Sequence, residues 1–276
     1  MRKKKVLLIN DFCGYGKVAL SAMLPMMTCF NVSCSYLPTA VVSNTLDYGY
    51  FALDPLSDYM KESIKTWGEL GLHFDAMTTG FFTDPQQVGL VEDYLNQPEQ
   101  EKTVLFCDPI MGDNGAIYPG VSAEMIPAFR RLLGCSSIAL PNYTEACVLT
   151  DHPYRREGSS KEELLELLEA IHELGAQSTI LTSCHLGEQA VVAGRTKAGE
   201  TFFLPYKEVK AAFPGTGDVF TSLIVGNYLQ GASMKEACGE AVDFLSQQIA
   251  RFQDQEDKLR GLPLDELVRA YRERKK

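Results

Sequence analysis

The chain has 276 residues, 45% of them hydrophobic, so it can bury a large core without disulfides or a structural metal. Its formal net charge is −10, with 36 acidic and 26 basic residues, which argues against a nucleic-acid or anionic-membrane partner. No apolar run approaches the length of a membrane span, the run at 6–9 is too short for a secretory signal, and the cysteines form no C-x-x-C pair. We therefore expect a cytoplasmic protein with reduced thiols.

In chain order, short apolar runs alternate with longer amphipathic segments. Strands are predicted at residues 6–9, 32–39, 75–79, 103–107, 137–140, 179–182, 189–193 and 201–204. Helices are predicted at 18–30, 55–70, 85–95 and 121–133, after a capping box formed by Ser160 and Glu163, and from about residues 217, 233 and 263. A turn is expected at 14–16 and an antiparallel hairpin around 197–199.

This alternation predicts an α/β fold, with a mostly parallel central sheet flanked by helices on both faces and a small antiparallel strand pair. No internal repeat, low-complexity tract or long linker divides the chain, so a single domain over 1–276 is expected. Open parallel sheets bind ligands at the carboxyl ends of their strands. We expect the functional residues at that edge.

The segment at 213–220, Phe-Pro-Gly-Thr-Gly-Asp-Val-Phe, carries the strongest chemical signal. Two glycines followed by an apolar run describe a loop that enters a helix, and the unpaired N–H groups of a helix N-terminus attract anions. Asp218 falls in the first helical turn, where its carboxylate could accept a hydroxyl proton beside a phosphoryl group held by the amides. The alternative is an ordinary glycine-rich turn with Asp218 as a capping acid.

Further segments accompany this motif in a fixed order. They read Asp-Pro-Ile-Met-Gly-Asp at 108–113, Pro-Asn-Tyr-Thr-Glu at 141–145, Asn-Asp-Phe-Cys-Gly-Tyr-Gly at 10–16 and Ser-Asn-Thr-Leu-Asp-Tyr-Gly at 43–49. Together with G-T-G-D they resemble the ribokinase-like superfamily, and the two early segments resemble its pyridoxal/pyridoxamine kinase branch. The resemblance spans nearly the whole chain and implies the three-layer ribokinase-like fold.

The resemblance also implies a role for each matching residue. Asp218 would be the general base, beside an anion hole made by the amides of Gly215, Thr216 and Gly217. Asp108 and Glu145 would hold Mg²⁺, through waters because that ion keeps much of its hydration shell. ATP contacts are implied for Asp113, Tyr118, Asn142, Glu145, Thr182 and Ser183. The loop at 112–120 would close over ATP.

The substrate pocket is where this chain departs from the family pattern. Substrate contacts are implied for Asp11, Thr39, Tyr48 and Phe81. The family commonly has Ser in place of Asp11, Tyr in place of Phe81 and a polar residue in place of Val41, whereas Thr39 is retained. Asp11 can accept a hydrogen bond or pair with a cation, but it donates only when protonated. Phe81 keeps the stacking area without the hydroxyl.

The implied activity is ATP-dependent phosphorylation of the 5′-hydroxymethyl group of pyridoxal, pyridoxamine or pyridoxine, with Mg²⁺ and a monovalent cation such as K⁺. A cytoplasmic homodimer that acts on a small molecule, without nucleic acid or membrane, is implied as well. A related alternative is a hydroxymethylpyrimidine (phosphate) kinase of thiamine synthesis, which shares G-T-G-D.

Alternatives outside this activity also follow from the sequence. Gly14, Gly16 and Ala19 fit the G-x-G-x-x-A fingerprint of an NAD-dependent oxidoreductase, although the acid expected about twenty residues later is absent. A non-catalytic nucleotide binder with the same fold is another alternative. The chain contains no G-x-x-x-x-G-K-[ST] sequence, which excludes a P-loop kinase.

Overall fold

The computed structural model describes residues 2–118 and 120–275, and these residues form an α/β structure. The strands are β1 (Lys4–Tyr15), β2 (Val32–Asn44), β3 (Leu53–Pro55), β4 (Ala76–Thr79), β5 (Val104–Cys107), β6 (Gly112–Asp113), β7 (Ala116–Ile117), β8 (Ile138–Ala139), β9 (Ser178–Leu186), β10 (Gln189–Arg195) and β11 (Thr201–Pro205). The helices are α1 (Ala19–Met27), α2 (Ser57–Glu69), α3 (Pro85–Leu95), α4 (Met125–Gly134), α5 (Tyr143–Thr150), α6 (Lys161–Glu173), α7 (Thr216–Leu229), α8 (Met234–Phe252) and α9 (Leu264–Arg274).

One large sheet runs through the molecule in the order β11-β10-β9-β8-β5-β4-β1-β2-β3. The pairs from β9 to β2 are parallel, whereas β10 and β11 at one edge and β3 at the other are antiparallel. Strands β6 and β7 form a separate small hairpin, which packs on α5. The carboxyl ends of the parallel strands therefore meet at one edge of the sheet.

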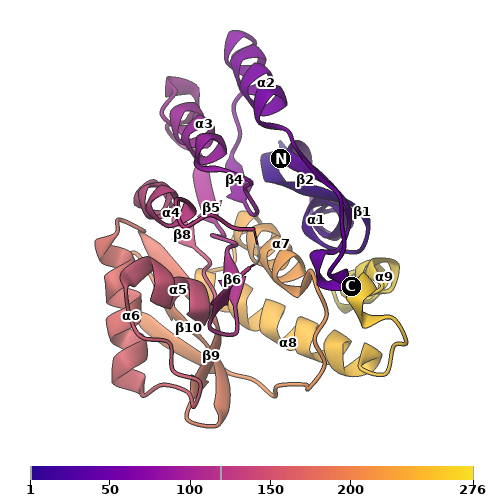
Figure 1. Cartoon of the computed structure of the whole chain (residues 1–276), viewed down its shortest axis with the longest axis vertical. Coiled ribbons are helices and arrows are strands. Elements are labelled where there is room, and N and C mark those ends of the chain that lie inside the picture. The colour runs from indigo at the N-terminus through magenta and orange to yellow at the C-terminus, as the bar shows by residue number, and fades with distance from the viewer. Residues whose placement is uncertain (1, 119, 276) are drawn as a thin grey trace.

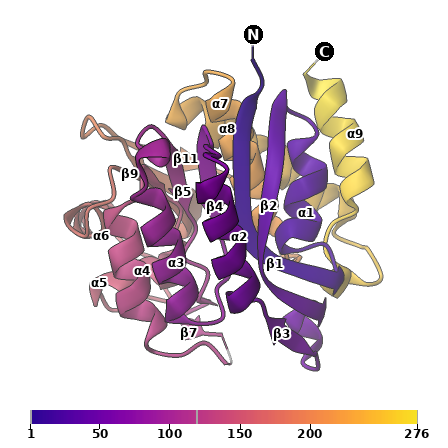
Figure 2. The ribbon, with the colours of Figure 1, turned by 90° about the horizontal axis from the view of Figure 1, so that it is seen from above.

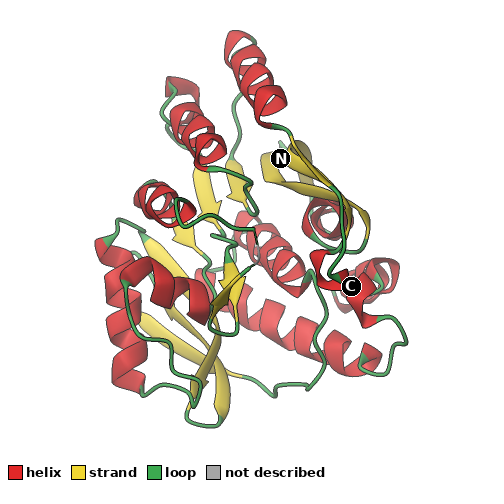
Figure 3. Ribbon diagram, viewed as in Figure 1, coloured by secondary structure: helices red, strands yellow, loops and turns green. Residues whose placement is uncertain are grey.

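Helices cover both faces of this sheet (Figures 1 and 3). Alternate residues of β1 belong to two different cores: Leu7 and Ile9 pack with α2 to α6, and Val6 and Leu8 pack with α1, α7, α8 and α9. The view in Figure 2 separates α2, α3 and α4 from α1 and α9 across the strands. Burial on both faces explains why the central strands read as continuous apolar runs.

The predicted fold class is confirmed, and every predicted strand and helix has a counterpart in the structure. The hairpin expected around 197–199 joins the antiparallel β10 and β11. Asp84 is the N-cap of α3, where its side chain accepts from Gln87 N. The capping box at Ser160 and Glu163 begins α6 as expected.

The sequence pattern missed α5, β3, β6 and β7, and it misplaced one turn and the start of α4. The turn expected at 14–16 is wrong, because β1 continues to Tyr15, which pairs with Asn44 at the end of β2. The α5 helix was missed because six of its eight residues are buried, so it lacks an amphipathic pattern. The short β3 and the β6–β7 hairpin have too few residues for periodicity to detect. Helix α4 starts at Met125, later than expected.

Candidate active site

The G-T-G-D loop forms an open helix N-terminus, as predicted. Gly215 is the N-cap of α7 and has a φ of +81°, a conformation that L side chains rarely adopt. A Cβ there would lie 2.1 Å from the backbone oxygen of Lys17, so only glycine allows this close approach. A Cβ at Gly217 would meet nothing within 4 Å, which leaves that side of the helix end open. The amides of this turn are therefore available to an anion.

Asp218 lies in the first turn of α7 and is 8% exposed. Each of its carboxylate oxygens accepts one hydrogen bond: Oδ1 from Asn10 Nδ2 at 2.9 Å and Oδ2 from Ala19 N at 2.7 Å. Burial raises the pKa of Asp218 to about 6, and these two donors, together with the backbone of Asp218 itself, hold it below the value that burial alone would give. A carboxylate in this range is ionised at neutral pH and close enough to it to accept a proton.

Asp108 and Glu145, the predicted metal residues, lie near Asp218 at the carboxyl end of β5. Asp108 follows β5, is 9% exposed, and its Oδ2 accepts from Thr221 Oγ1 of α7 at 3.1 Å. Glu145 is 2% exposed, so it is not a solvated first-turn acid. Its Oε2 accepts from Asn142 N at 2.8 Å and its Oε1 from Met111 N at 3.0 Å. The capping box of α5 thus fixes this carboxylate toward the site.

Buried negative charge accumulates at this edge of the sheet. Burial and the neighbouring Asp218 raise the pKa of Asp11 to about 7 and that of Asp108 to about 8. Burial, followed by the charge of Asp108, raises the pKa of Glu145 well above its usual range. No ion pair among residues 2–118 and 120–275 involves any of these four acids. The site therefore has an excess of negative charge that a bound cation would offset.

These residues fit a magnesium ion whose other ligands are water and phosphate oxygens. Carboxylate oxygens of Asp108 and Glu145 are the hard donors that Mg²⁺ prefers, and the ion usually keeps several waters. Within the described residues, no group of three or more His, Cys, Asp or Glu side chains surrounds one ion position. Two carboxylates without a complete cage suit an ion that arrives with water and phosphate oxygens.

This cluster predicts how stability depends on pH. Because the folded-state pKa values of Asp218, Asp11 and Asp108 are raised to about 6, 7 and 8, their contribution to stability is full below about pH 4 and is lost as pH rises through about 6 to 8; the raised pKa of Glu145 acts in the same direction. A carboxyl whose pKa is one pH unit higher in the folded protein than in the unfolded chain changes the free energy of unfolding by about 1.4 kcal/mol. We expect the Tm measured by calorimetry to fall between pH 5 and 8.5, and the fall to be smaller in Asp108→Asn. A Tm that is flat or rises over this range would contradict the charge cluster.

The predicted ATP residues fall into two groups. Asn142 is the N-cap of α5, donates from Nδ2 to Gly112 O at 2.8 Å, and forms a bridge with Thr182 at the end of the parallel ladder. Thr182 and Ser183 oppose the single residue Val192, which marks a β-bulge, and Ser183 has a φ of +55°. This irregularity interrupts the ladder next to Asn142, where backbone groups can face a ligand.

The described part of the predicted cover loop lies close to the same acids. Asp113 belongs to β6, and Tyr118 follows β7 with its N–H donating to Met111 O at 2.9 Å. Burial, followed by the charges of Asp113 and Glu145, raises the pKa of the Tyr118 hydroxyl. Pro119, within the predicted loop, lies outside the described residues. Asp113 and Tyr118 thus lie near the acid cluster, and their contact with ATP stays a prediction.

Of the predicted substrate residues, three are brought together. Thr39 is fully buried, and its Oγ1 donates to Phe81 O at 2.8 Å. Phe81 N donates to Asn10 Oδ1 at 2.8 Å, which connects this pair to Asp11, the next residue of β1. Tyr48 differs, because its hydroxyl donates to Asp257 Oδ2 at 2.7 Å and so ties its segment to the chain near the C-terminus. Its role as a substrate contact stays a prediction.

Sequence reasoning did not assign three residues that contact the acids. Asn10 and Ala19 donate to Asp218, and Thr221 donates to Asp108. Asn10 had a detectable signal, since it interrupts the apolar run of β1 with a polar residue that is 2% exposed. The contact made by the Ala19 backbone amide depends on no side-chain type, so no motif could indicate it.

The dinucleotide-binding interpretation of Gly14, Gly16 and Ala19 is wrong for this structure. The first two residues of the fingerprint do not form a phosphate-binding turn, because β1 runs through Gly14 to Tyr15. A Cβ at Gly16 would lie 2.0 Å from Thr45 Oγ1, so this glycine permits packing against Thr45. The amide of Ala19 donates to the Asp218 carboxylate and is therefore not free to bind a phosphate.

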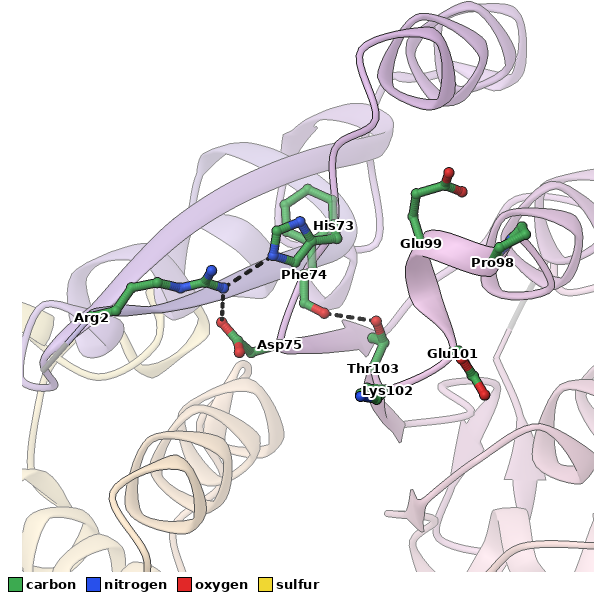
Figure 4. A pocket seen from close by; sticks show the side chains of 9 residues that line it. All are labelled: Arg2, His73, Phe74, Asp75, Pro98, Glu99, Glu101, Lys102 and Thr103. Atoms are coloured by element: carbon green, nitrogen blue, oxygen red, sulfur yellow. Dashed lines mark hydrogen bonds and ion pairs between the residues drawn. The ribbon is translucent and has the colours of Figure 1, made fainter.

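Two cavities lie outside the acid cluster. One, of about 430 Å³, is lined by Arg2 and by residues of the segments just before β4 and β5, at 73–75 and 98–103, at the opposite ends of the strands (Figure 4). Its polar groups bond one another, since Arg2 Nη2 contacts His73 Nε2 at 3.1 Å and Asp75 Oδ2 at 3.4 Å. The other, of about 480 Å³, borders the β6–β7 hairpin at Gly115 and the α5 helix. Neither contains a predicted catalytic residue.

Comparison with known proteins identifies relatives over most of the chain. The model of the family described as phosphomethylpyrimidine kinase matches residues 22–260. The pyridoxal kinase of Ovis aries is 28% identical over 199 residues, a match that covers 64% of this chain and 62% of that protein. The chain thus matches less than two thirds of the length of this curated relative. None of the described helices combines the length and apolarity needed to span a membrane.

Solved structures extend the likeness to nearly the full chain. A Bacteroides thetaiotaomicron protein assigned as a phosphomethylpyrimidine kinase, crystallised with pyridoxal, is 32% identical with a TM-score of 0.90, covering 98% of this chain and 96% of its own. The pyridoxal kinase of Lactobacillus plantarum is 27% identical with a TM-score of 0.86, covering 97% and 96%. The predicted ribokinase-like fold is confirmed by these neighbours.

Proposed function

Because this chain belongs to the phosphomethylpyrimidine kinase family, we propose that it is an ATP-dependent kinase for the 5′-hydroxymethyl group of a vitamin B6 compound. The observation that carries the proposal is the pairing of Asp218 with the open N-terminus of α7. The base and the anion-binding amides belong to the same helical turn, so a hydroxyl and the phosphoryl group that it attacks would meet there. The pyridoxal bound by the Bacteroides thetaiotaomicron relative and the names of the other relatives favour a B6 substrate.

The proposed reaction assigns each step to a residue of this chain. Asp218 accepts the proton of the substrate hydroxymethyl group. The oxygen of that hydroxymethyl group forms a bond to the γ-phosphorus of ATP. The bond from that phosphorus to the β,γ-bridging oxygen breaks, and ADP leaves. The amides of Gly215, Thr216 and Gly217 stabilise the charge on the transferred group. Asp218 then releases its proton to solvent, which leaves the phosphate ester and restores the base.

The carboxylates of Asp108 and Glu145 would hold Mg²⁺. When bound, the ion neutralises charge on the phosphate oxygens. Asn142, Thr182 and Ser183 are proposed to contact the nucleotide, with Asp113 and Tyr118 in the loop that covers it. A monovalent cation and a cytoplasmic location are proposed on resemblance alone.

A homodimer is proposed on the same resemblance. Phe12 and Val41 are register partners on β1 and β2 and are 42% and 43% exposed. Large apolar side chains exposed together favour a protein contact.

The proposal is tested by ADP release in a coupled assay. We expect ATP- and Mg²⁺-dependent turnover with pyridoxal, pyridoxamine or pyridoxine, and a product that carries the phosphate on the 5′-oxygen. The description of the matching family favours a second candidate, hydroxymethylpyrimidine, which is included as a parallel substrate. Turnover of hydroxymethylpyrimidine alone would replace the B6 proposal, and no turnover with any of the four would reject kinase activity on this substrate class.

Asp11 is proposed to set the choice among B6 compounds. It lies within β1 next to Asn10, whose side chain accepts from Phe81 N, and burial, followed by the charge of Asp218, raises its pKa to about 7. A cationic substrate would favour the ionised carboxylate, and pyridoxamine carries an ammonium where pyridoxal carries an aldehyde. A partly solvated charge pair is worth about 1–2 kcal/mol, or about a three- to thirty-fold ratio of kcat/KM. We expect pyridoxamine to be preferred by that ratio, increasingly so from pH 6 to pH 8.

The matching variant is Asp11→Ser, which introduces the residue common in the family. We expect it to level the ratio of kcat/KM for pyridoxamine and pyridoxal and to remove the dependence of that ratio on pH. A parent enzyme that prefers pyridoxal, with the same preference in Asp11→Ser, would exclude Asp11 from substrate selection. That outcome would leave the role of Asp218 untouched.

A further inference from the structure

Asn10 is the buried polar residue that connects the candidate base to the sheet. We propose that Asn10 is a positioning residue, which holds the Asp218 carboxylate in the orientation that accepts the substrate proton. The inference rests on the proposed function in one respect, that Asp218 is the base. Asn10 itself would not touch the substrate, because both polar atoms of its amide are already occupied by protein groups.

The hydrogen bonds fix which way the Asn10 amide faces. Its Oδ1 accepts from two backbone N–H groups, those of Asp11 at 3.0 Å and Phe81 at 2.8 Å. An N–H group cannot accept in return, so Oδ1 must lie on that side and Nδ2 must face Asp218 Oδ1, at 2.9 Å. The amide therefore presents a donor to the carboxylate in one orientation only.

The local backbone is built around this side chain. The β1–β2 register shifts between Asn10 and Phe12, so the ladder is interrupted just where Asn10 turns toward α7. A Cβ at Gly80 would lie 2.4 Å from Asn10 Cγ and from Nδ2, so the absence of a side chain at Gly80 leaves the space that Asn10 occupies. Three segments of the chain, in β1, after β4 and in α7, thus meet at one amide.

Ala19 supplies the second hydrogen bond to the same carboxylate. Its N–H donates to Asp218 Oδ2 at 2.7 Å, and its φ is +49°, an unfavourable conformation for a residue with a Cβ. Strained backbone persists where the surroundings require it, and such sites gather at functional positions. Because each carboxylate oxygen accepts a hydrogen bond from a different donor, rotation of the Asp218 carboxylate about its Cβ–Cγ bond is restricted.

The titratable groups that face Asp218 are all acidic or neutral. Asp11 and Cys13 come from β1, and Asp108 comes from the end of β5. Burial raises the pKa of Asp218 to about 6, and only hydrogen bonds from Ala19, Asn10 and the backbone of Asp218 itself lower it. Loss of the Asn10 donor should therefore move the Asp218 pKa upward, with no nearby cation in the described residues to compensate.

Two substitutions separate positioning from a structural role. Asn10→Asp keeps an oxygen for the two backbone N–H groups but removes the donor and adds charge, whereas Asn10→Leu removes donor and acceptor alike. If Asn10 acts through Asp218, the acidic limb of the pH profile of kcat/KM moves upward in both variants, and further in Asn10→Asp. We expect the limb to move by about 0.5 in pH or more, and kcat/KM at pH 7 to fall by about 10- to 100-fold. A purely structural role predicts the reverse order, with Asn10→Leu the more damaged.

A double variant provides the second readout. In an Asp218→Asn background, Asn10→Leu should lower the residual kcat by less than about threefold, because the group that it orients is already gone. A full additional loss in that background would overturn the proposal. The matched control is Asn227→Ala, which removes a buried, hydrogen-bonded Asn from the other end of α7. It should lower Tm without moving the pH profile.

The outcome does not depend on the kinase assay alone. If no substrate is turned over, the proposed function fails, yet the pKa of Asp218 is still measurable by carboxyl ¹³C NMR, with the resonance assigned by its loss in Asp218→Asn. A higher pKa in Asn10→Leu supports the inference, and an unchanged pKa overturns it. If the Asn10 variants do not fold, Gly80→Ala displaces the same side chain without removing it and is subject to the same two outcomes.

Discussion

Replacing Asp218 with Asn is expected to lower kcat by about 10²- to 10⁴-fold, the usual loss when a general base is removed. The substitution keeps the size of the side chain but cannot accept a proton from the substrate hydroxyl. Because the anion-binding amides of α7 belong to the backbone, the affinity for ATP should change little. The measurement is steady-state ADP release at saturating ATP and Mg²⁺, together with the Kd of ATP by calorimetry.

The matched control for this variant is Asp58→Asn, at another acid in the first turn of a helix. Asp58 is exposed and belongs to none of the predicted catalytic, ATP or substrate sites, so its substitution should leave kcat within about twofold of the parent. Near-normal turnover in Asp218→Asn would remove this residue from the mechanism. A matching loss of ATP binding would instead indicate that the helix end had been disturbed.

The sequence was sufficient for the sheet because hydrophobic burial determines its pattern. Strands buried on both faces, such as β5 with Leu105 and Phe106 in opposite cores, read as apolar runs whatever the loops between them do. Helix α5 was missed because burial also removes the amphipathic pattern by which a helix is recognised. It is short and buried on nearly all sides, so Cys147 and Leu149 carry no helical stripe, and its capping box at Asn142 and Glu145 was interpreted only as a chemical motif.

The site was predictable only as far as side-chain types reveal it. Motifs indicated Asp218, Asp108 and Glu145, and the structure brings these three acids together at the carboxyl edge of the sheet. Motifs could not indicate that the Ala19 backbone would donate to Asp218, since a main-chain contact leaves no trace in composition. Nor could they show that the hydroxyl of Tyr48 would be engaged by Asp257, more than two hundred positions later in the chain.

Gly215→Ala is expected to have the second large effect, because two separate penalties coincide at this residue. Its φ of +81° costs a side chain about 1–3 kcal/mol, and the new Cβ would lie 2.1 Å from the backbone oxygen of Lys17, which must move. Movement of that contact shifts the N-terminal amides of α7 relative to Asp218. Misplacement by about 1 Å is enough for a loss of about 100-fold in kcat/KM. We therefore expect both a lower Tm and that kinetic loss.

Gly199→Ala separates the two penalties. Gly199 has a φ of +84°, nearly the same as Gly215, but a Cβ there meets nothing within 4 Å. It should lower the free energy of unfolding by about 1 kcal/mol through the backbone term alone, with kcat/KM unchanged. The difference between the two variants then measures what the contact with Lys17 contributes to holding the helix end against the base. If Gly215→Ala were as stable and as active as Gly199→Ala, the close approach of these two segments would have no part in phosphoryl transfer.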